Sequence, residues 1–138
     1  MFTPSPPAVA VAFLIGCSAS AEQPGHGAGV TNVLSESGAL RVVLHASPEA
    51  VPARGTNALD LDVVRADSEE PVLGLSLSMV PFMPAMGHGS SVVPRCSEAG
   101  DGHYRCDDVV LSMPGLWELR TTIAGTESDA VVFRFDVD

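Results

Sequence analysis

Apolar and polar residues alternate along most of the chain, and a period of two is typical of β-strands with one buried face. The clearest run is Leu73, Leu75, Leu77 and Met79, which alternate with glycine and serine. The same alternation covers residues 59–64, 109–113, 117–123 and 131–137, and further strands are expected over residues 40–46 and 91–93. The pattern predicts about seven strands.

Stretches rich in glycine, proline, aspartate and serine separate these runs. They cover residues 48–55, 67–71, 81–89, 99–102, 114–115 and 125–129. Short strands joined by such turns predict an all-β fold, a single immunoglobulin-like antiparallel β-sandwich. A small closed barrel is the alternative. We expect Trp117 to pack in the core between the sheets.

The N-terminal part of the chain has a different character. Residues 8–16 are apolar but too few to span a bilayer, and they end in Leu14-Ile15-Gly16-Cys17, which resembles a bacterial lipobox. We therefore expect a lipoprotein signal peptide over residues 1–16, a lipidated Cys17 and flexible linker over residues 17–33, and the sandwich over residues 34–138. The protein would be anchored by lipid to a membrane of the cell envelope and face the periplasm or the cell exterior. One departure is that no Lys or Arg precedes the apolar run, and a buried cysteine is the alternative to a lipidated one.

Composition narrows the class of protein further. A chain of 138 residues has room for one domain, and 7 Lys+Arg against 17 Asp+Glu give a formal net charge of −10. Because phosphate binding needs a basic face, this balance argues against a nucleic-acid partner. With 46% hydrophobic and only 17% charged residues, the chain is not a disordered acidic tail.

Two cysteines remain besides Cys17. Cys96 and Cys106 flank the turn sequence Gly100-Asp101-Gly102, and a hairpin through that turn would bring the two thiols together. We predict a disulfide between them. A metal-binding cysteine pair, helped by His103, is the competing interpretation, but the spacing is not that of a zinc site.

One segment combines soft metal donors. Met83, Met86 and His88 lie within a single loop, and Met113 lies in a second short loop. Thioether sulfur and imidazole together suit Cu(I), so a folded loop could direct these side chains at one ion. Pro84 and Gly87 are interpreted as helping the loop to bend.

The spacing of these residues resembles the YtkA-like domain family, which is related to the FixH proteins. The matching motifs are Met83-Pro84-x-Met86-Gly87-His88 and Met113-Pro114-Gly115-x-Trp117, supported by Gly102-x-Tyr104 and Gly55-x-Asn57. The resemblance implies a small exported β-sandwich, often lipid- or membrane-anchored. Because FixH-type proteins are linked with copper delivery to haem–copper oxidases, it also implies copper ligands at Met83, Met86, His88 and Met113, with Met79 in reserve. A respiratory oxidase or a metal transport system is then the kind of membrane partner to expect.

Two other interpretations stay open. In the first, Met83 and Met113 fill the end of the sandwich, the prolines and Gly87 shape a turn, and His88 caps a backbone carbonyl, with no metal involved. In the second, the domain is an interaction module that contacts a membrane partner through a sheet edge or the methionine-rich loop. An enzyme is not expected, because the sequence contains no nucleophile elbow, zincin motif or phosphate-binding glycine loop.

Overall fold

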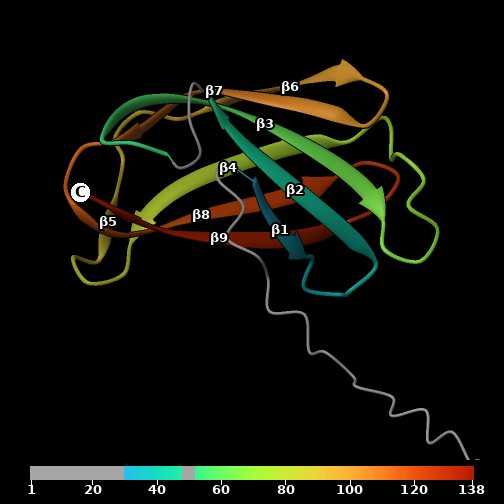
Figure 1. Cartoon of the computed structure of the whole chain (residues 1–138), viewed down its shortest axis with the longest axis horizontal. Coiled ribbons are helices and arrows are strands. Elements are labelled where there is room, and N and C mark those ends of the chain that lie inside the picture. The colour runs from blue at the N-terminus through green and yellow to red at the C-terminus, as the bar shows by residue number, and fades with distance from the viewer. Residues whose placement is uncertain (1–29, 48–51) are drawn as a thin grey trace, which may run out of the picture.

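Two antiparallel β-sheets pack face to face in the computed structural model, which describes residues 30–47 and 52–138 (Figure 1). The predicted signal peptide, the predicted lipidation site Cys17 and most of the predicted linker lie outside the described residues. The strands are β1 Val30–Leu34, β2 Leu40–Ser47, β3 Gly55–Arg65, β4 Ser76–Met83, β5 His88–Gly89, β6 Arg95–Gly100, β7 His103–Leu111, β8 Gly115–Ala124 and β9 Asp129–Val137. No helix among the described residues has the length and apolarity needed to cross a membrane.

The strand order confirms the predicted sandwich. One sheet has the order β1-β2-β3-β7-β6 and the other the order β5-β4-β8-β9. Without the edge strands β1 and β5, this is the four-plus-three arrangement of constant-type immunoglobulin domains. The first strand, β1, begins at Val30, inside the segment predicted as linker, and pairs along β2 from Val30↔His45 to Leu34↔Arg41.

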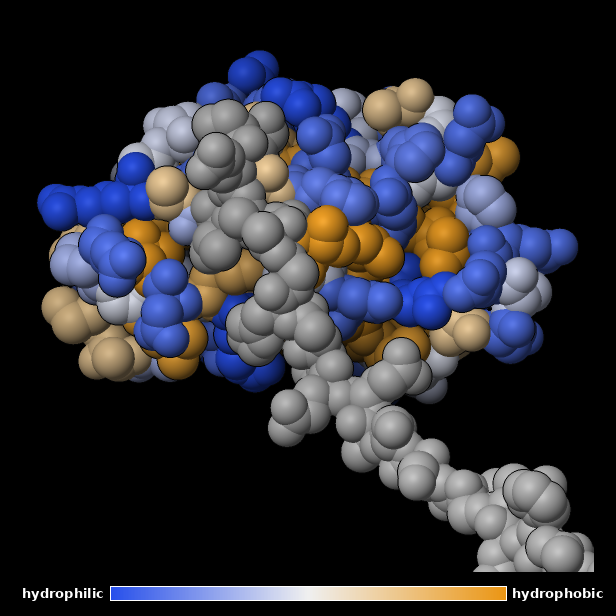
Figure 2. Space-filling view, viewed as in Figure 1, coloured by the Kyte–Doolittle hydropathy of each residue, from blue (hydrophilic) through white to orange (hydrophobic). Residues whose placement is uncertain are grey.

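The core lies between the two sheets and is built from the alternating positions. Leu59, Leu61 and Val63 of β3 are buried, as are Trp117, Leu119 and Ile123 of β8. Trp117 is fully buried and faces Phe135 across the β8–β9 pair. Residues between these positions point to solvent, and hydrophilic side chains cover much of the face seen in Figure 2. The period of two therefore predicted correctly which face of each of these strands is buried.

The strand predicted from Leu73 to Met79 is displaced toward the C-terminus. Leu75 and Met79 are buried, but Leu73 is 53% exposed and β4 starts only at Ser76. The cause is the Tyr104 hydroxyl, which donates to Val72 O at 2.7 Å and accepts from Leu75 N at 3.2 Å. These two bonds hold the chain off the sheet around Leu73, and burial raises the pKa of the Tyr104 hydroxyl.

The end of β4 also differs from the prediction, because the strand continues through Pro81 to Met83. Pro81 O accepts from Ser90 N, which places the backbone polar groups of Pro81 on the side away from β8. Since that edge carries only the short β5, the missing N–H of proline removes no bond of the main sheet. The strand predicted over residues 91–93 is wrong; those residues form a connection between β5 and β6.

The predicted disulfide is present. Cys96 of β6 and Cys106 of β7 are directly opposite each other in register, with 4.0 Å between their Cα atoms. Cys106 is fully buried and Cys96 packs against the core. The bond therefore attaches the exposed edge strand β6 to the interior of its sheet.

Where β9 begins, hydrogen bonds attach the β1–β2 turn to this strand. Glu36 N donates to Ala130 O at 2.8 Å, and Ser37 donates to the Asp129 carboxylate. Partial burial raises the pKa of Asp129, but bonds from Ser37, Ser35 and Ala130 outweigh it and lower that pKa from 3.8 to about 2. The turn covers part of the free edge of β9.

Removal of the disulfide should destabilise the domain. We expect Cys96→Ser/Cys106→Ser to lower the free energy of unfolding by about 2–3 kcal/mol, because the closed loop no longer restricts the unfolded chain. Urea denaturation with and without reductant measures this. Reductant should shift the wild-type midpoint and leave that of the double variant unchanged; equal midpoints for the reduced and oxidised wild type would contradict the expectation.

Asp129 should make stability depend on pH in acid. Its folded-state pKa lies below the unfolded value, so its contribution is complete above about pH 4 and is lost as the pH falls toward about 2. Urea midpoints between these pH values should fall less steeply for Asp129→Asn than for wild type. Asp136→Asn, on the same strand, serves as the matched control and should keep the wild-type slope. Parallel profiles for Asp129→Asn and wild type would rule out this role.

Candidate functional site

The connection between β4 and β5 is a tight hairpin turn. Met86 N and Gly87 N both donate to Met83 O, at 3.2 and 3.0 Å, and Met83 faces His88 in register. Gly87 has a φ of 65°, in the left-handed region. These are the features of a type I turn followed by a left-handed glycine, and proline is favoured at the second position of such a turn. Turn geometry thus explains Pro84 and Gly87.

Met83 closes the core at this end of the sandwich. Its side chain is only 4% exposed, although His88 and Gly89 of β5, across the turn, are at the surface. A Cβ atom on Gly115, at the start of β8, would lie 3.0 Å from the methyl carbon of Met83, and Gly115 has a φ of 127°. Gly115 is therefore required both by its backbone conformation and by the space that Met83 fills.

Trp117 fixes the connection that leads into β8. Its indole Nε1 donates to Met113 O at 2.9 Å. Met113 itself is half-buried and packs against the core. The bond explains the separation of Met113 and Trp117 in the second motif, because the carbonyl four residues before Trp117 must lie at the edge of the ring, opposite the indole N–H.

The supporting motif residues also have structural roles. The amide of Asn57 bonds both the N–H and the carbonyl of Ala53, at 2.8 and 2.7 Å, and also donates to Val109 O. Gly102 has a φ of 78°, and a Cβ there would lie 2.8 Å from Cβ of Pro71. Asn57 therefore holds the chain that enters β3, and Gly102 permits close contact between the β6–β7 turn and the β3–β4 connection.

The predicted metal ligands lie at one end of the sandwich but differ in access. Met86 is 56% exposed on the turn and His88 is exposed on β5, whereas Met83 is buried and Met113 is half-buried. The structure places Met79, the reserve ligand, 1% exposed in the middle of β4 opposite Thr121. Met79 is therefore a core residue and is not part of the site.

A guanidinium–aromatic contact stabilises the outer face of β4 beside the hairpin. The Arg120 guanidinium lies 3.9 Å from the centroid of the Phe82 ring. Arg120 and Arg134 both pair with Glu118, and the hydrogen bond from Arg120 is the main cause that lowers the pKa of Glu118. The residue that precedes Met83 is thus held on the outside of the sheet while Met83 points inward.

One cluster of titratable residues was not predicted from the sequence. Asp62 of β3 contacts His45 of β2 at 2.9 Å through one carboxylate oxygen and His103 of β7 through the other. The alternation of β3 already placed Asp62 on the outer face, but its neighbours depend on strand pairing. Within the described ranges, no group of three or more His, Cys, Asp or Glu side chains could hold a metal ion. We interpret these contacts as hydrogen bonds at the surface that connect three strands.

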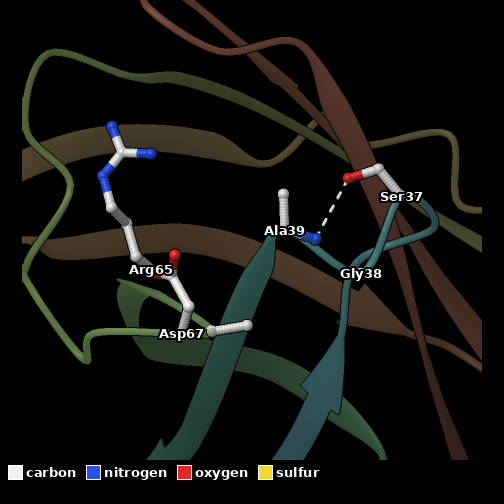
Figure 3. A pocket seen from close by; sticks show the side chains of 6 residues that line it. Ser37, Gly38, Ala39, Arg65 and Asp67 are labelled. Atoms are coloured by element: carbon white, nitrogen blue, oxygen red, sulfur yellow. Dashed lines mark hydrogen bonds between the residues drawn. The ribbon is translucent and has the colours of Figure 1, made fainter.

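A hollow lies at the end of the sandwich opposite the β4–β5 hairpin (Figure 3). Its walls come from the β1–β2 turn and the end of β3: Ser37, Gly38, Ala39, Arg65, Ala66 and Asp67. Ala39 N donates to Ser37 Oγ at 3.2 Å, and the Arg65 guanidinium is paired with Glu127. None of the predicted ligands lines this hollow, and its one cation is already neutralised by a carboxylate.

The buried and exposed methionines of the hairpin should respond differently to truncation. Met83→Ala removes a core side chain and should cost about 2–5 kcal/mol of unfolding free energy. Met86→Ala is the matched exposed variant and should stay within about 0.5 kcal/mol of wild type. Chemical denaturation measures both. Equal losses at the two positions would mean that Met83 does not close the core.

The comparison with known proteins agrees with the motifs. The family model described as YtkA-like matches residues 35–122. The match extends from the β1–β2 turn into β8 and includes the hairpin, both halves of the disulfide and the Gly115–Trp117 segment. Neither a curated protein nor a solved structure matches the chain. Because the model spans well over half of the sequence and the observed sandwich carries its motif residues, the chain belongs to the YtkA-like family.

Proposed function

We propose that this domain is a non-enzymatic binding domain of the cell envelope, and that it binds Cu(I) through Met86 and His88. The observation that carries the proposal is the exposure of these two side chains on a hairpin whose other motif residues have structural roles. Pro84 and Gly87 are needed for the turn, and Met83 is needed for the core. The fold does not account for a thioether and an imidazole at its surface.

The chemistry of the donors favours a soft monovalent ion. Thioether sulfur is neutral and polarisable, and imidazole is a borderline ligand, so the pair suits Cu(I) better than Ca²⁺ or Mg²⁺. Met113 lies half-buried at the same end and is the nearest candidate for a further donor. Met83, which the sequence also suggested, could join only by leaving the core.

The cellular setting belongs to the same proposal. A lipid on Cys17 would hold the domain at a membrane, where it delivers or buffers copper for a membrane protein such as a respiratory oxidase or a metal transport system. The Cys96–Cys106 disulfide supports a location outside the cytoplasm, since such bonds persist in oxidising compartments.

A second candidate is an interaction module without a metal. It is favoured by the composition of the hairpin region, because residues 80–94 contain no Asp, Glu, Lys or Arg. Met86 and Val93 are exposed there, and exposed methionine is an adaptable contact for apolar partners. In this candidate the hairpin is a structural turn whose outer side contacts a protein.

Anaerobic competition with a colorimetric Cu(I) chelator separates the two candidates. The full chain carries Cys17→Ser, so that no free thiolate contributes, and keeps its disulfide. We expect sub-micromolar affinity in the parent, and at least about a hundredfold weaker binding, roughly 3 kcal/mol, in Met86→Leu/His88→Ala. Leucine keeps the apolar volume of Met86 while removing the sulfur.

Met79→Leu is the control, because it removes a buried thioether from β4, the strand that leads into the hairpin, without changing the hairpin itself. It should bind Cu(I) as the parent does. Binding by the parent that does not exceed that of Met86→Leu/His88→Ala would reject the copper proposal and leave the interaction module.

A further inference from the structure

Each chain exposes an incomplete set of soft donors. Met86 and His88 are at the surface, but Met83 is 4% exposed and fills the space beside Gly115. Met113 is only half-buried, yet it packs against the core and its carbonyl is fixed by Trp117. Two donors from one hairpin leave a Cu(I) ion open to solvent and to further soft ligands.

The two chain segments around the donors contain no charged residue, and the Arg120 guanidinium lies at their edge, 3.9 Å from the centroid of the Phe82 ring. We define the uncharged tip as residues 80–94 and 109–117, neither of which contains Asp, Glu, Lys or Arg. Its exposed apolar side chains come from the end of β4, the hairpin, the β5–β6 connection and the start of β8: Val80, Met86, Val92, Val93 and Leu116. A protein of net charge −10 thus exposes several apolar side chains at its hairpin end, on two segments that carry no charged residue.

The remaining charge is concentrated elsewhere. Six of the seven arginines form ion pairs with carboxylates among the described residues. They neutralise the carboxylates with which they pair and leave the excess acidic residues uncompensated. The loops at the far end of the sandwich add Asp67, Glu70 and Asp101. Asp136, opposite Leu116 in register, stands at the rim of the tip. Two copies that meet at their tips would keep their acidic far ends as distant as the molecule allows.

We propose that the tip is an interface for a second copy of this chain, and that two copies share one Cu(I) between their Met86 and His88 side chains. The inference rests on the proposed Cu(I) site. A twofold axis through the ion presents the same patch from both chains, as closed dimers require. The second copy completes the donor set and covers Met86, Val93 and Leu116 at once.

A lipid surface fits the tip less well. Proteins that bind the bilayer interface use basic residues together with exposed tryptophan or tyrosine. The two segments of the tip have no Lys or Arg, and the neighbouring Arg120 is paired with Glu118. The one tryptophan of the tip, Trp117, is fully buried. A second neutral and apolar protein surface is the better match.

Sedimentation velocity during an anaerobic Cu(I) titration tests the interface. The sample is the full chain with Cys17→Ser and an intact disulfide, and the bound ion is quantified with a chelator. We expect a monomer without metal and a dimer that holds one Cu(I) per two chains. One Cu(I) bound to a monomer would overturn the shared site but leave the proposed function intact, whereas no retained Cu(I) would reject both.

Two charge variants locate the surface without removing a ligand. In the dimer, Val93→Asp places one carboxylate from each chain at the interface. The Val93 side chain is 76% exposed, so the fold should persist. Its dimer dissociation constant should rise at least about tenfold. Leu73→Asp adds the same charge on the β3–β4 connection, at the far end, and should dimerise like the parent. A dimer unaffected by Val93→Asp would place the interface elsewhere and overturn the inference.

Discussion

The hydrogen bond from the Trp117 indole to the Met113 carbonyl determines the geometry of the hairpin end. A buried indole N–H without an acceptor would cost about 1–3 kcal/mol, so the β7–β8 connection must pass the edge of the ring that carries this N–H. That position brings Gly115 beside Met83, and the absence of a side chain at Gly115 gives the Met83 methyl its space. With Met83 fixed inside, the turn that follows projects Met86 outward.

The two motifs therefore combine residues of different physical meaning. Backbone conformation explains Pro84, Gly87 and Gly115. Packing in the core explains Met83 and Trp117. These roles support the structural interpretation of the loop for most of its residues. Met86 and His88 are exposed and have no such structural role, and the proposed function is therefore placed on them. The hairpin is at once a structural closure and the carrier of the candidate site.

The edges of the sheets carry features that limit pairing with other chains. An open strand edge invites pairing with another chain, and three strands here, β6, β9 and β4, carry different features that restrict such pairing. The disulfide attaches β6 to the core, the β1–β2 turn bonds to Ala130 of β9, and Pro81 removes a donor from the outer side of β4. Association through backbone pairing is thereby discouraged at these places. The proposed interface at the tip instead uses exposed apolar side chains.

The period of two, the turn residues and the cysteine spacing were enough to predict the sandwich, the buried faces of β3 and β8, and the Cys96–Cys106 bond, because each depends on local geometry. The location of the candidate donors in the hairpin was also readable, since Pro84 and Gly87 mark the turn. The start of β4 was not, because it depends on the hydroxyl of Tyr104, which is distant in sequence. Tertiary structure alone decided that Met83 is buried while Met86 is exposed. Side chains of one type are distinguished only by which sheet covers them.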